Sequence, residues 1–353
     1  MTRKPIRVLI VDDSSLIRQL LKEILSADDS FDIVGEARDA YEARELIKQL
    51  NPDVITLDIE MPGMNGITFL KNLMRLRPMP VVMISTLTEK GADITLEALE
   101  IGAVDFVTKP KIDQPDGMRK IAQVIQAKVR AAARANVAAI EHITQQQQFS
   151  WPIKPENGKR LNGDIKLIAI GASTGGTEAI KETLLPLPVA MPPIVIVQHM
   201  PAGFTKSFAE RLDNLLPHTV IELTQRSVLE PGHIYIANGS EHMLVTKHNN
   251  GQLFAYCEDS EPVNRHKPSV DTLFYSVAEQ CPTQSIGVIL TGMGMDGAQG
   301  LKSMQTNGAQ TIAQDEKTSI VWGMPRAAAE LNAVDEVLPL NRISQRLIDI
   351  CYR

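Results

Sequence analysis

A serine in a glycine-rich turn has a residue type and a spacing that indicate a possible nucleophile. Ser173 lies in segment 171–176, which directly follows an apolar run at 166–170 and precedes helix-forming residues. This order predicts a strand, a sharp turn and a helix. The spacing Gly-x-Ser-x-Gly meets the requirement of a nucleophile elbow, in which small neighbours expose a serine above a sheet. The same glycines could equally form a turn that packs or binds phosphate, so the motif alone leaves both readings open.

A serine hydroxyl needs a neighbouring base to act as a nucleophile at neutral pH. His199 directly follows the apolar run 193–198, so it is predicted at the carboxyl end of a buried strand, one crossover from the strand that precedes Ser173. We expect the two side chains to meet above adjacent strands. A histidine that only satisfies backbone groups in a loop is an equally plausible interpretation of His199 taken alone.

An orienting carboxylate should come from a third strand end on the same edge. Asp296 fits, because it lies in the glycine-rich loop 292–297 after the apolar run 285–291. The glycines let the backbone fold tightly around Asp296, and the exposed N–H groups could form part of an oxyanion hole. A loop that binds a metal or phosphate through Asp296 is the alternative.

The second half of the chain, from about residue 164, alternates short apolar runs with amphipathic stretches. Strands are predicted at 166–170, 194–198, 219–223, 233–237, 242–247, 252–256, 286–290 and 309–313. Helices are predicted at 176–185, 203–215, 269–280, 297–306, 324–331 and 342–350. The pattern predicts a mainly parallel, doubly wound α/β sheet, with an antiparallel hairpin extension at the Asn-Asn-Gly turn of residues 249–251.

The first 130 residues show a similar alternation, with buried strands predicted at 6–11, 54–57, 81–84 and 105–107. Polar residues stand at the strand ends, namely Asp12, Asp13, Asp58, Ser85 and Lys109. Carboxylates crowded on one sheet edge repel each other, and a hard cation such as Mg²⁺ relieves that repulsion. A lysine and a hydroxyl beside them can hold a phosphoryl group.

These strand-end residues, together with segment 61–66 after Asp58, resemble the receiver domain of two-component response regulators over about residues 5–130. The resemblance implies a flavodoxin-like fold in which Asp58 accepts a phosphoryl group from the phosphohistidine of a sensor kinase. It also implies that Asp12, Asp13 and Asp58 hold Mg²⁺, and that Ser85 and Lys109 bind phosphoryl oxygens.

The whole chain resembles a second family. A receiver fused to segments 171–176, 198–200 and 292–297 is similar to the chemotaxis response regulators of the protein-glutamate methylesterase/protein-glutamine glutaminase (CheB) family. The chain order Ser, His, Asp differs from the order Ser, Asp/Glu, His of the α/β-hydrolase fold, which argues against membership there. The resemblance implies hydrolysis of glutamate methyl esters, and deamidation of particular glutamines, on chemoreceptors, with no cofactor for the hydrolysis.

The same resemblance implies roles for individual residues. Ser173 would attack the ester, His199 would accept and return the proton, and Asp296 would hold the imidazolium. Backbone donors near Thr174 and Met293 would bind the oxyanion. Arg265, in a further family-like segment at 265–269, could steer the acidic receptor helices towards the cleft.

Chain length and composition predict the number of domains and argue against a secreted protein, a membrane protein and a cysteine metal site. At 353 residues the chain should form two domains, and we predict a receiver at 1–130, a helical extension and linker at 131–163, and a catalytic domain at 164–353. The N-terminus lacks the apolar core of a secretory signal, and no apolar run is long enough to insert into a membrane, so we expect a cytoplasmic protein. The three cysteines lack the spacing of a metal site.

The formal net charge of −6 argues against nucleic-acid binding, because no segment is strongly basic. A receiver-coupled nucleotide-binding module is the remaining alternative. Segment 171–176 lacks the spacing Gly-x-Gly-x-x-Gly, and His199 stands where a ribose-binding acid would be expected.

Overall fold

The structure is a computed structural model that describes residues 4–86, 88–109, 115–139, 160–161 and 163–352. It divides into two compact units, Met1–Gln146 and Gln147–Arg353. Most of the predicted linker 131–163, including Trp151, lies outside the described residues, so the three-part division of the chain stays a prediction. Among the described residues, no helix combines the length and the apolar character needed to cross a membrane.

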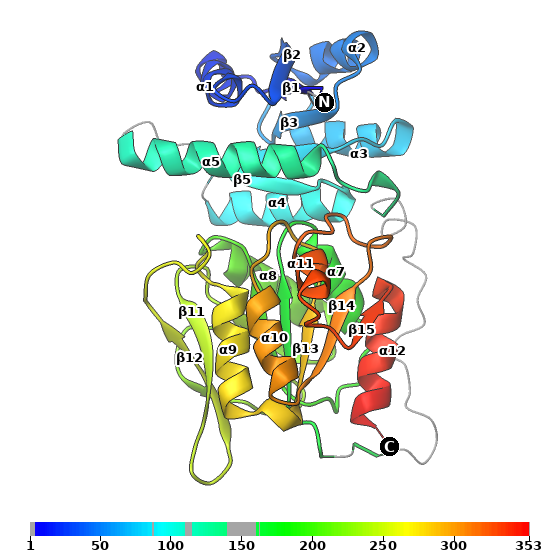
Figure 1. Ribbon diagram of the computed structural model, residues 1–353. Coiled ribbons are helices and arrows are strands. Elements are labelled where there is room, and N and C mark those ends of the chain that lie inside the picture. Colours follow the sequence, from blue (N-terminus) through cyan, green and yellow to red (C-terminus); the bar gives the residue numbers. More distant parts are fainter. Residues whose placement is uncertain (1–3, 87, 110–114, 140–159, 162, 353) are drawn as a thin grey trace. The chain divides into compact units, whose positions relative to one another are not determined.

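The N-terminal unit is a five-stranded parallel sheet in the order β2-β1-β3-β4-β5 (Figure 1). This order is that of the flavodoxin-like fold. Its strands are β1 (Ile6–Val11), β2 (Phe31–Ala37), β3 (Val54–Asp58), β4 (Val81–Ser85) and β5 (Asp105–Thr108). Its helices are α1 (Ser15–Ser26), α2 (Ala40–Leu50), α3 (Gly66–Leu76), α4 (Glu89–Ile101) and α5 (Pro115–Ala132).

Local sequence explains where these helices begin. Four of them start behind a side chain that accepts a hydrogen bond from a backbone N–H of the first turn: Ser14, Asp39, Asn65 and Thr88. The central strands β3 and β4 are buried at every residue, as apolar parallel strands covered on both faces must be. Helix α5 ends at Ala132, and residues 137–139 are again helical.

The C-terminal unit is built on a seven-stranded parallel sheet in the order β15-β14-β13-β6-β7-β10-β8. Its strands are β6 (Leu167–Ala172), β7 (Ile194–Gln198), β8 (Thr219–Leu223), β10 (His233–Ala237), β13 (Ser285–Ile289), β14 (Gln310–Gln314) and β15 (Glu336–Leu338). The chain leaves β6 towards β7 on one side and later returns on the other side as β13. β6 is therefore the point where the strand order reverses, the usual place for a ligand site in such sheets.

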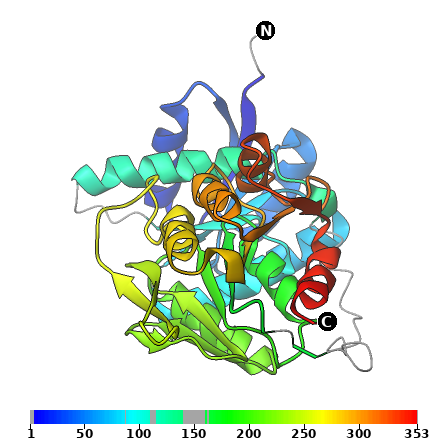
Figure 2. The ribbon, with the colours of Figure 1, turned by 60° about the horizontal axis from the view of Figure 1, so that its bottom comes forward.

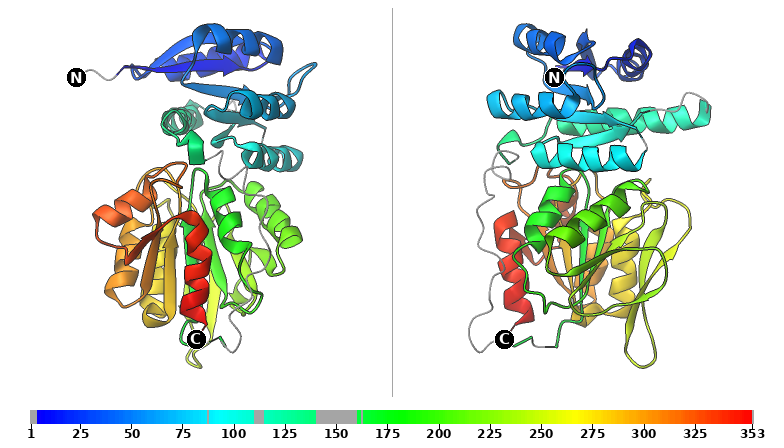
Figure 3. Two further views of the ribbon diagram at one scale, coloured as in Figure 1. Left: turned by 90° about the vertical axis from the view of Figure 1, so that its right-hand side faces the viewer. Right: turned by 180° about the vertical axis from the view of Figure 1, so that it is seen from behind.

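Helices cover both faces of this sheet, with α9 and α10 on one face and α7 and α8 on the other (Figure 3). The helices are α7 (Gly176–Leu184), α8 (Phe204–Leu215), α9 (Val270–Gln280), α10 (Ala298–Thr306), α11 (Met324–Glu330) and α12 (Leu340–Cys351). An antiparallel sheet of β11 (His242–Lys247), β12 (Leu253–Glu258) and β9 (Ser227–Val228) lies beside α9 (Figure 2). The predicted fold class, two doubly wound α/β domains with an antiparallel hairpin extension, is confirmed.

Candidate active site

Ser173 occupies the turn between β6 and α7. The turn requires small residues, because a Cβ on Gly176 would lie 2.1 Å from Oε1 of Gln198. Gly175 adopts a φ of 75°, which favours glycine. The Ser173 N–H donates to the Thr291 carbonyl at 3.1 Å, and its own carbonyl accepts from Nε2 of Gln198 at 2.9 Å. The backbone of Ser173 is thus fixed from both neighbouring strands.

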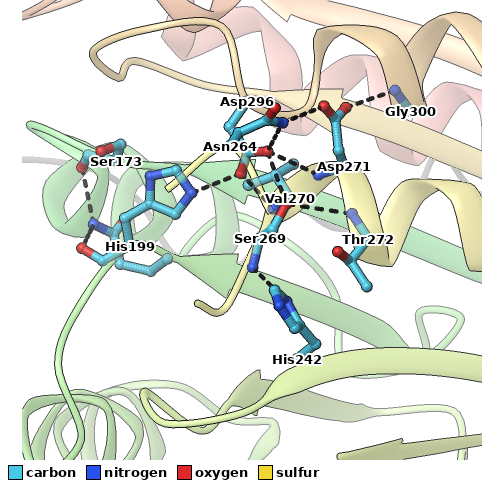
Figure 4. A network of polar contacts seen from close by, with 11 residues as sticks. Ser173, His199, His242, Asn264, Ser269, Val270, Asp271, Thr272, Asp296 and Gly300 are labelled. Atoms are coloured by element: carbon cyan, nitrogen blue, oxygen red, sulfur yellow. Dashed lines mark hydrogen bonds and ion pairs between the residues drawn. The ribbon is translucent and has the colours of Figure 1, made fainter. Parts of the chain in front are cut away.

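His199 follows β7 at the same sheet edge, and its N–H donates to the Ala172 carbonyl at 3.1 Å. Nε2 of the ring lies 2.8 Å from Oδ2 of Asp296. A nitrogen that donates to a carboxylate leaves the other ring nitrogen as the basic one. Nδ1 is buried and accepts no hydrogen bond from the residues that the structure describes. The ring lies between Ser173 and Asp296, so Nδ1 is the atom available to take a proton from Ser173 (Figure 4).

Asp296, in the loop between β13 and α10, is 1% exposed. Its carboxylate accepts hydrogen bonds from five groups: His199 Nε2, Asn264 Nδ2, Ser269 Oγ and the N–H groups of Val270 and Asp271. The last two belong to the first turn of α9, where the helix dipole favours negative charge. Burial alone would raise the pKa of Asp296, but the hydrogen bonds from His199, Asn264 and Ser269 outweigh it and hold the pKa well below the usual range.

The loop that carries Asp296 also approaches Ser173 closely. A Cβ on Gly292 would lie 2.8 Å from Cβ of Ser173, so a larger residue would displace the serine. Met293 is half-buried, and its N–H donates to no atom of the described chain. Thr174 is buried, and its carbonyl accepts from Oγ1 of Thr291 at 3.0 Å. Arg265 is exposed, in a turn next to the Asp296 network.

A second polar cluster lies at the carboxyl edge of the N-terminal sheet. Carboxylate oxygens of Asp12, Asp13 and Asp58 lie within 4.8 Å of one another, which fits the oxygen ligands that Mg²⁺ prefers. Nζ of Lys109 lies 2.9 Å from Oδ2 of Asp58 and 3.3 Å from Oδ2 of Asp12. Burial and the charge of Asp12 raise the pKa of Asp58 to about 6, against the lowering effect of Lys109.

Ser85, at the end of β4, is fully buried beside this cluster. Its Oγ accepts a hydrogen bond from Oγ1 of Thr95 in α4 at 2.7 Å. It also lies 3.3 Å from the Thr86 carbonyl. In this structure the hydroxyl is held by Thr95 and by backbone groups of its own loop.

Comparison with known proteins identifies the family. Residues 168–347 match the CheB methylesterase family, and residues 8–123 match the response regulator receiver domain. The chain belongs to the CheB methylesterase family. It is 52% identical to protein-glutamate methylesterase/protein-glutamine glutaminase 2 of Vibrio vulnificus, over 99% of each chain. The protein of the same name from Bordetella avium is 51% identical, over 98% of this chain and 97% of the relative.

A solved structure supports the same assignment for the second unit. The crystal structure of the Thermotoga maritima CheB methylesterase catalytic domain is 40% identical, with a TM-score of 0.51. It covers 53% of this chain and 98% of the Thermotoga chain. The alternative of a receiver-coupled nucleotide-binding module is not favoured by these relatives.

Several residues of this CheB-family site were not predicted from the sequence. Asn264, Ser269 and the first turn of α9 donate to Asp296, and His266 stacks on His199 with ring centroids 3.8 Å apart. A signal was present for Ser269, because a serine before an apolar helical stretch is a typical N-cap. Nothing in the sequence linked Asn264 to Asp296, since 31 residues separate them in the chain and only the fold brings them together.

Proposed function

We propose that this chain is a phosphorylation-activated serine hydrolase that demethylates glutamate methyl esters, and deamidates specific glutamines, on chemoreceptors. The names of its full-length relatives support the activity. The single observation that carries the chemistry is the placement of His199. Its Nε2 is bound to Asp296, and its free Nδ1 lies on the side of Ser173.

In the proposed reaction, Oγ of Ser173 attacks the ester carbonyl carbon while Nδ1 of His199 takes the hydroxyl proton. Collapse of the tetrahedral intermediate breaks the bond to the methoxy oxygen, and the imidazolium returns the proton to the departing methanol. A water molecule then attacks the acyl-enzyme and gives a proton to Nδ1. The second collapse breaks the bond to Oγ, which takes that proton back, and the glutamic acid side chain that is released ionises to glutamate. Deamidation follows the same steps with ammonia as the leaving group.

The fixed charge of Asp296 supports this cycle. The carboxylate bound to Nε2 keeps the His199 ring oriented and stabilises the imidazolium that forms twice per turnover. In the serine-protease triad Nε2 of the histidine faces the serine. In this chain Nε2 of His199 faces the aspartate, and Nδ1 is the nitrogen on the side of the serine. The unpartnered N–H of Met293 and the main chain at Thr174 are the proposed donors to the oxyanion.

For the receiver, the proposal is that Asp58 attacks a phosphohistidine of a chemotaxis histidine kinase. The kinase histidine leaves as the acyl phosphate forms. Mg²⁺, held by Asp12, Asp13 and Asp58, would supply charge neutralisation at the transferring group. Lys109 already lies against Asp58 and would pair with the phosphoryl oxygens. Ser85 would exchange its contact with Thr95 for the new acceptor, which is how the phosphoryl group would reshape the surface near α4.

The proposed consequence of phosphorylation is freer access of the receptor to Ser173. Demethylation and deamidation both leave glutamate carboxylates on the substrate, so the exposed Arg265 is a candidate for guiding an acidic segment. The proposed substrates and the proposed kinase are both proteins, and the formal net charge of −6 argues against nucleic acid as a further partner.

Replacement of Ser173 by Ala tests the proposed nucleophile. We expect methanol release from methylated receptors to fall to the background rate, because the proposed acyl-enzyme forms on Oγ of Ser173. Ser240→Ala, which removes an exposed serine of the same domain, is the matched control and should keep full activity. Turnover by the Ser173→Ala chain above the rate without enzyme would refute the assignment.

A further inference from the structure

Asn264 has contacts that the catalytic proposal above does not use. Its Nδ2 donates to Oδ1 of Asp296 at 2.8 Å and to Oδ2 of Asp271 at 2.7 Å. An amide nitrogen carries two hydrogens, so these two bonds use both of them. Asp271 is itself buried, at 3% exposure, and its Oδ1 accepts from the Gly300 N–H at 2.6 Å. A single exposed asparagine therefore bridges two buried carboxylates (Figure 4).

The backbone around Asn264 explains how an exposed residue reaches this position. Val263 and His266 exchange two hydrogen bonds, at 3.1 and 2.9 Å, across a two-residue turn. The central residues Asn264 and Arg265 have φ values of 54° and 68°. Two successive positive φ values are typical of a type I′ turn, a conformation in which Asn, Asp and Gly are favoured. The same turn carries His266, whose ring stacks on His199 with an interplanar angle of 6°.

The amide of Asn264 lies between two negatively charged carboxylates. Without a donor between them, the carboxylates of Asp271 and Asp296 would repel each other at close range in a buried site. Other ionisable groups near these two carboxylates include His199, His266, Arg265 and Tyr275. Hydrogen bonds that hold Asp296 in place also hold the Nε2 side of His199, because the two are joined at 2.8 Å.

From this geometry we infer that Asn264 is a positioning residue for the reaction: its side-chain amide fixes the Asp296 carboxylate against His199 by bridging it to Asp271. The inference rests on the proposed hydrolase function and adds a residue to it. Asn264 acts through Asp296, because its side-chain amide donates to Asp296 and Asp271 and not to Ser173 or His199.

Two substitutions at Asn264 test this role while keeping the turn. Asn264→Gly suits the positive φ but has no amide, and Asn264→Asp keeps the shape but replaces the donor with a third carboxylate. We expect kcat for methanol release to fall about tenfold for Asn264→Gly, the scale of one hydrogen bond to a charged group, and further for Asn264→Asp. KM should stay within about twofold of the unchanged chain, since substrate binding is not altered.

A spectroscopic readout separates positioning from a loss of folded protein. The proton on Nε2 of His199, bound to a carboxylate, should give a low-field NMR signal in the substrate-free protein. The signal should shift or broaden in both Asn264 variants, while thermal unfolding changes little. Asn332→Gly and Asn332→Asp are matched controls, because Asn332 is exposed and has a similar φ of 51°. Neither control should change kcat or the signal.

The outcomes distinguish this inference from the proposed function. If Asn264→Gly keeps kcat within about twofold and leaves the His199 signal in place, the positioning role is wrong. A rise in KM with an unchanged signal would also overturn it, because Asn264 would then be a substrate contact. If the unaltered chain releases no methanol, the hydrolase proposal fails instead, and the NMR comparison still decides whether Asn264 positions Asp296.

Discussion

Two buried aspartates, each at the carboxyl edge of a parallel sheet, have pKa shifts of opposite direction in this chain. Asp58 and Asp296 are each 1% exposed. Burial raises the pKa of Asp58 to about 6, and the charge of Asp12 adds to the shift. At Asp296 burial acts in the same direction, yet hydrogen bonds from His199, Asn264 and Ser269 bring its pKa below the usual range. Equal burial therefore gives opposite shifts, and the surrounding donors decide the sign.

The difference matches the chemistry proposed for each residue. A carboxylate that attacks phosphorus needs an oxygen that is not bound by several backbone donors, and Oδ2 of Asp58 has the ammonium group of Lys109 beside it. A carboxylate that only stabilises an imidazolium must stay charged and still, and Asp296 is held by a helix N-terminus and two side chains. The fold supplies the same strand-end position for both, and the loops around it supply the contrast.

Neutralising the Asp296 carboxylate should reduce the hydrolysis rate strongly. Asp296→Asn should lower kcat for methanol release by about 10³ to 10⁴, because the amide cannot stabilise the imidazolium and favours the wrong ring tautomer. Steady-state assays on methylated receptors measure it. Asp349→Asn, which alters an exposed helix residue, should leave kcat unchanged. A loss of less than about tenfold would mean that the charge of Asp296 is not needed.

Titration of the two carboxyl groups tests the comparison itself. Carboxyl-carbon NMR in metal-free buffer should show Asp58 changing its protonation near pH 6, in line with its raised pKa. Asp296 should stay ionised at pH values where ordinary aspartates take up a proton, because its pKa is lowered. Addition of Mg²⁺ should move the Asp58 midpoint to lower pH and leave Asp296 unaffected. The opposite order of the two midpoints would contradict the account.

A third carboxylate gives a smaller effect, on stability. Burial and the charge of Glu178 raise the pKa of Glu182, on α7, to about 7, although Lys181 acts against the shift. A raised folded-state pKa means that the folded state is penalised increasingly as pH rises from about 4.5 through 7. Glu182→Gln should therefore stabilise the protein by about 1–3 kcal/mol at pH 8 and have little effect at pH 4.

Chemical unfolding at pH 4, 6 and 8 measures this difference. Glu210→Gln, an exposed carboxylate on α8, is the control and should show no comparable gain with pH. A stabilisation of Glu182→Gln that is equal at all three pH values would show that packing, and not charge, is responsible.

Much of the fold and many of the candidate site residues could be predicted from the sequence, because the informative residues stand at strand ends. The apolar runs before Asp58, Ser173 and His199 locate buried parallel strands, and the fold class follows from their alternation with helices. Three strands were not predicted: β2, β9 and β15. β2 is an edge strand with a charged and glycine-containing sequence, and β9 and β15 have two and three residues, too few for a periodic pattern.

The donors to Asp296 could not be predicted, because they depend on contacts across the fold. Asn264 reaches Asp296 only because a tight turn packs against the start of α9. The orientation of the His199 ring also depends on the tertiary structure, which places Nε2, and not Nδ1, against Asp296. Sequence identified the candidate side chains, whereas the charge and orientation of each depend on neighbours from other segments. The catalytic roles stay predictions until variants are assayed.

Phosphorylation of Asp58 is proposed to control hydrolysis at Ser173. The direct test measures methanol release by the full chain with Mg²⁺, with and without a small-molecule phosphodonor, for the unaltered protein and for Asp58→Asn. We predict that the phosphodonor increases the rate of the unaltered chain and leaves the rate of Asp58→Asn unchanged. The same rate with and without phosphodonor in the unaltered chain, or equal stimulation of Asp58→Asn, would contradict the claim.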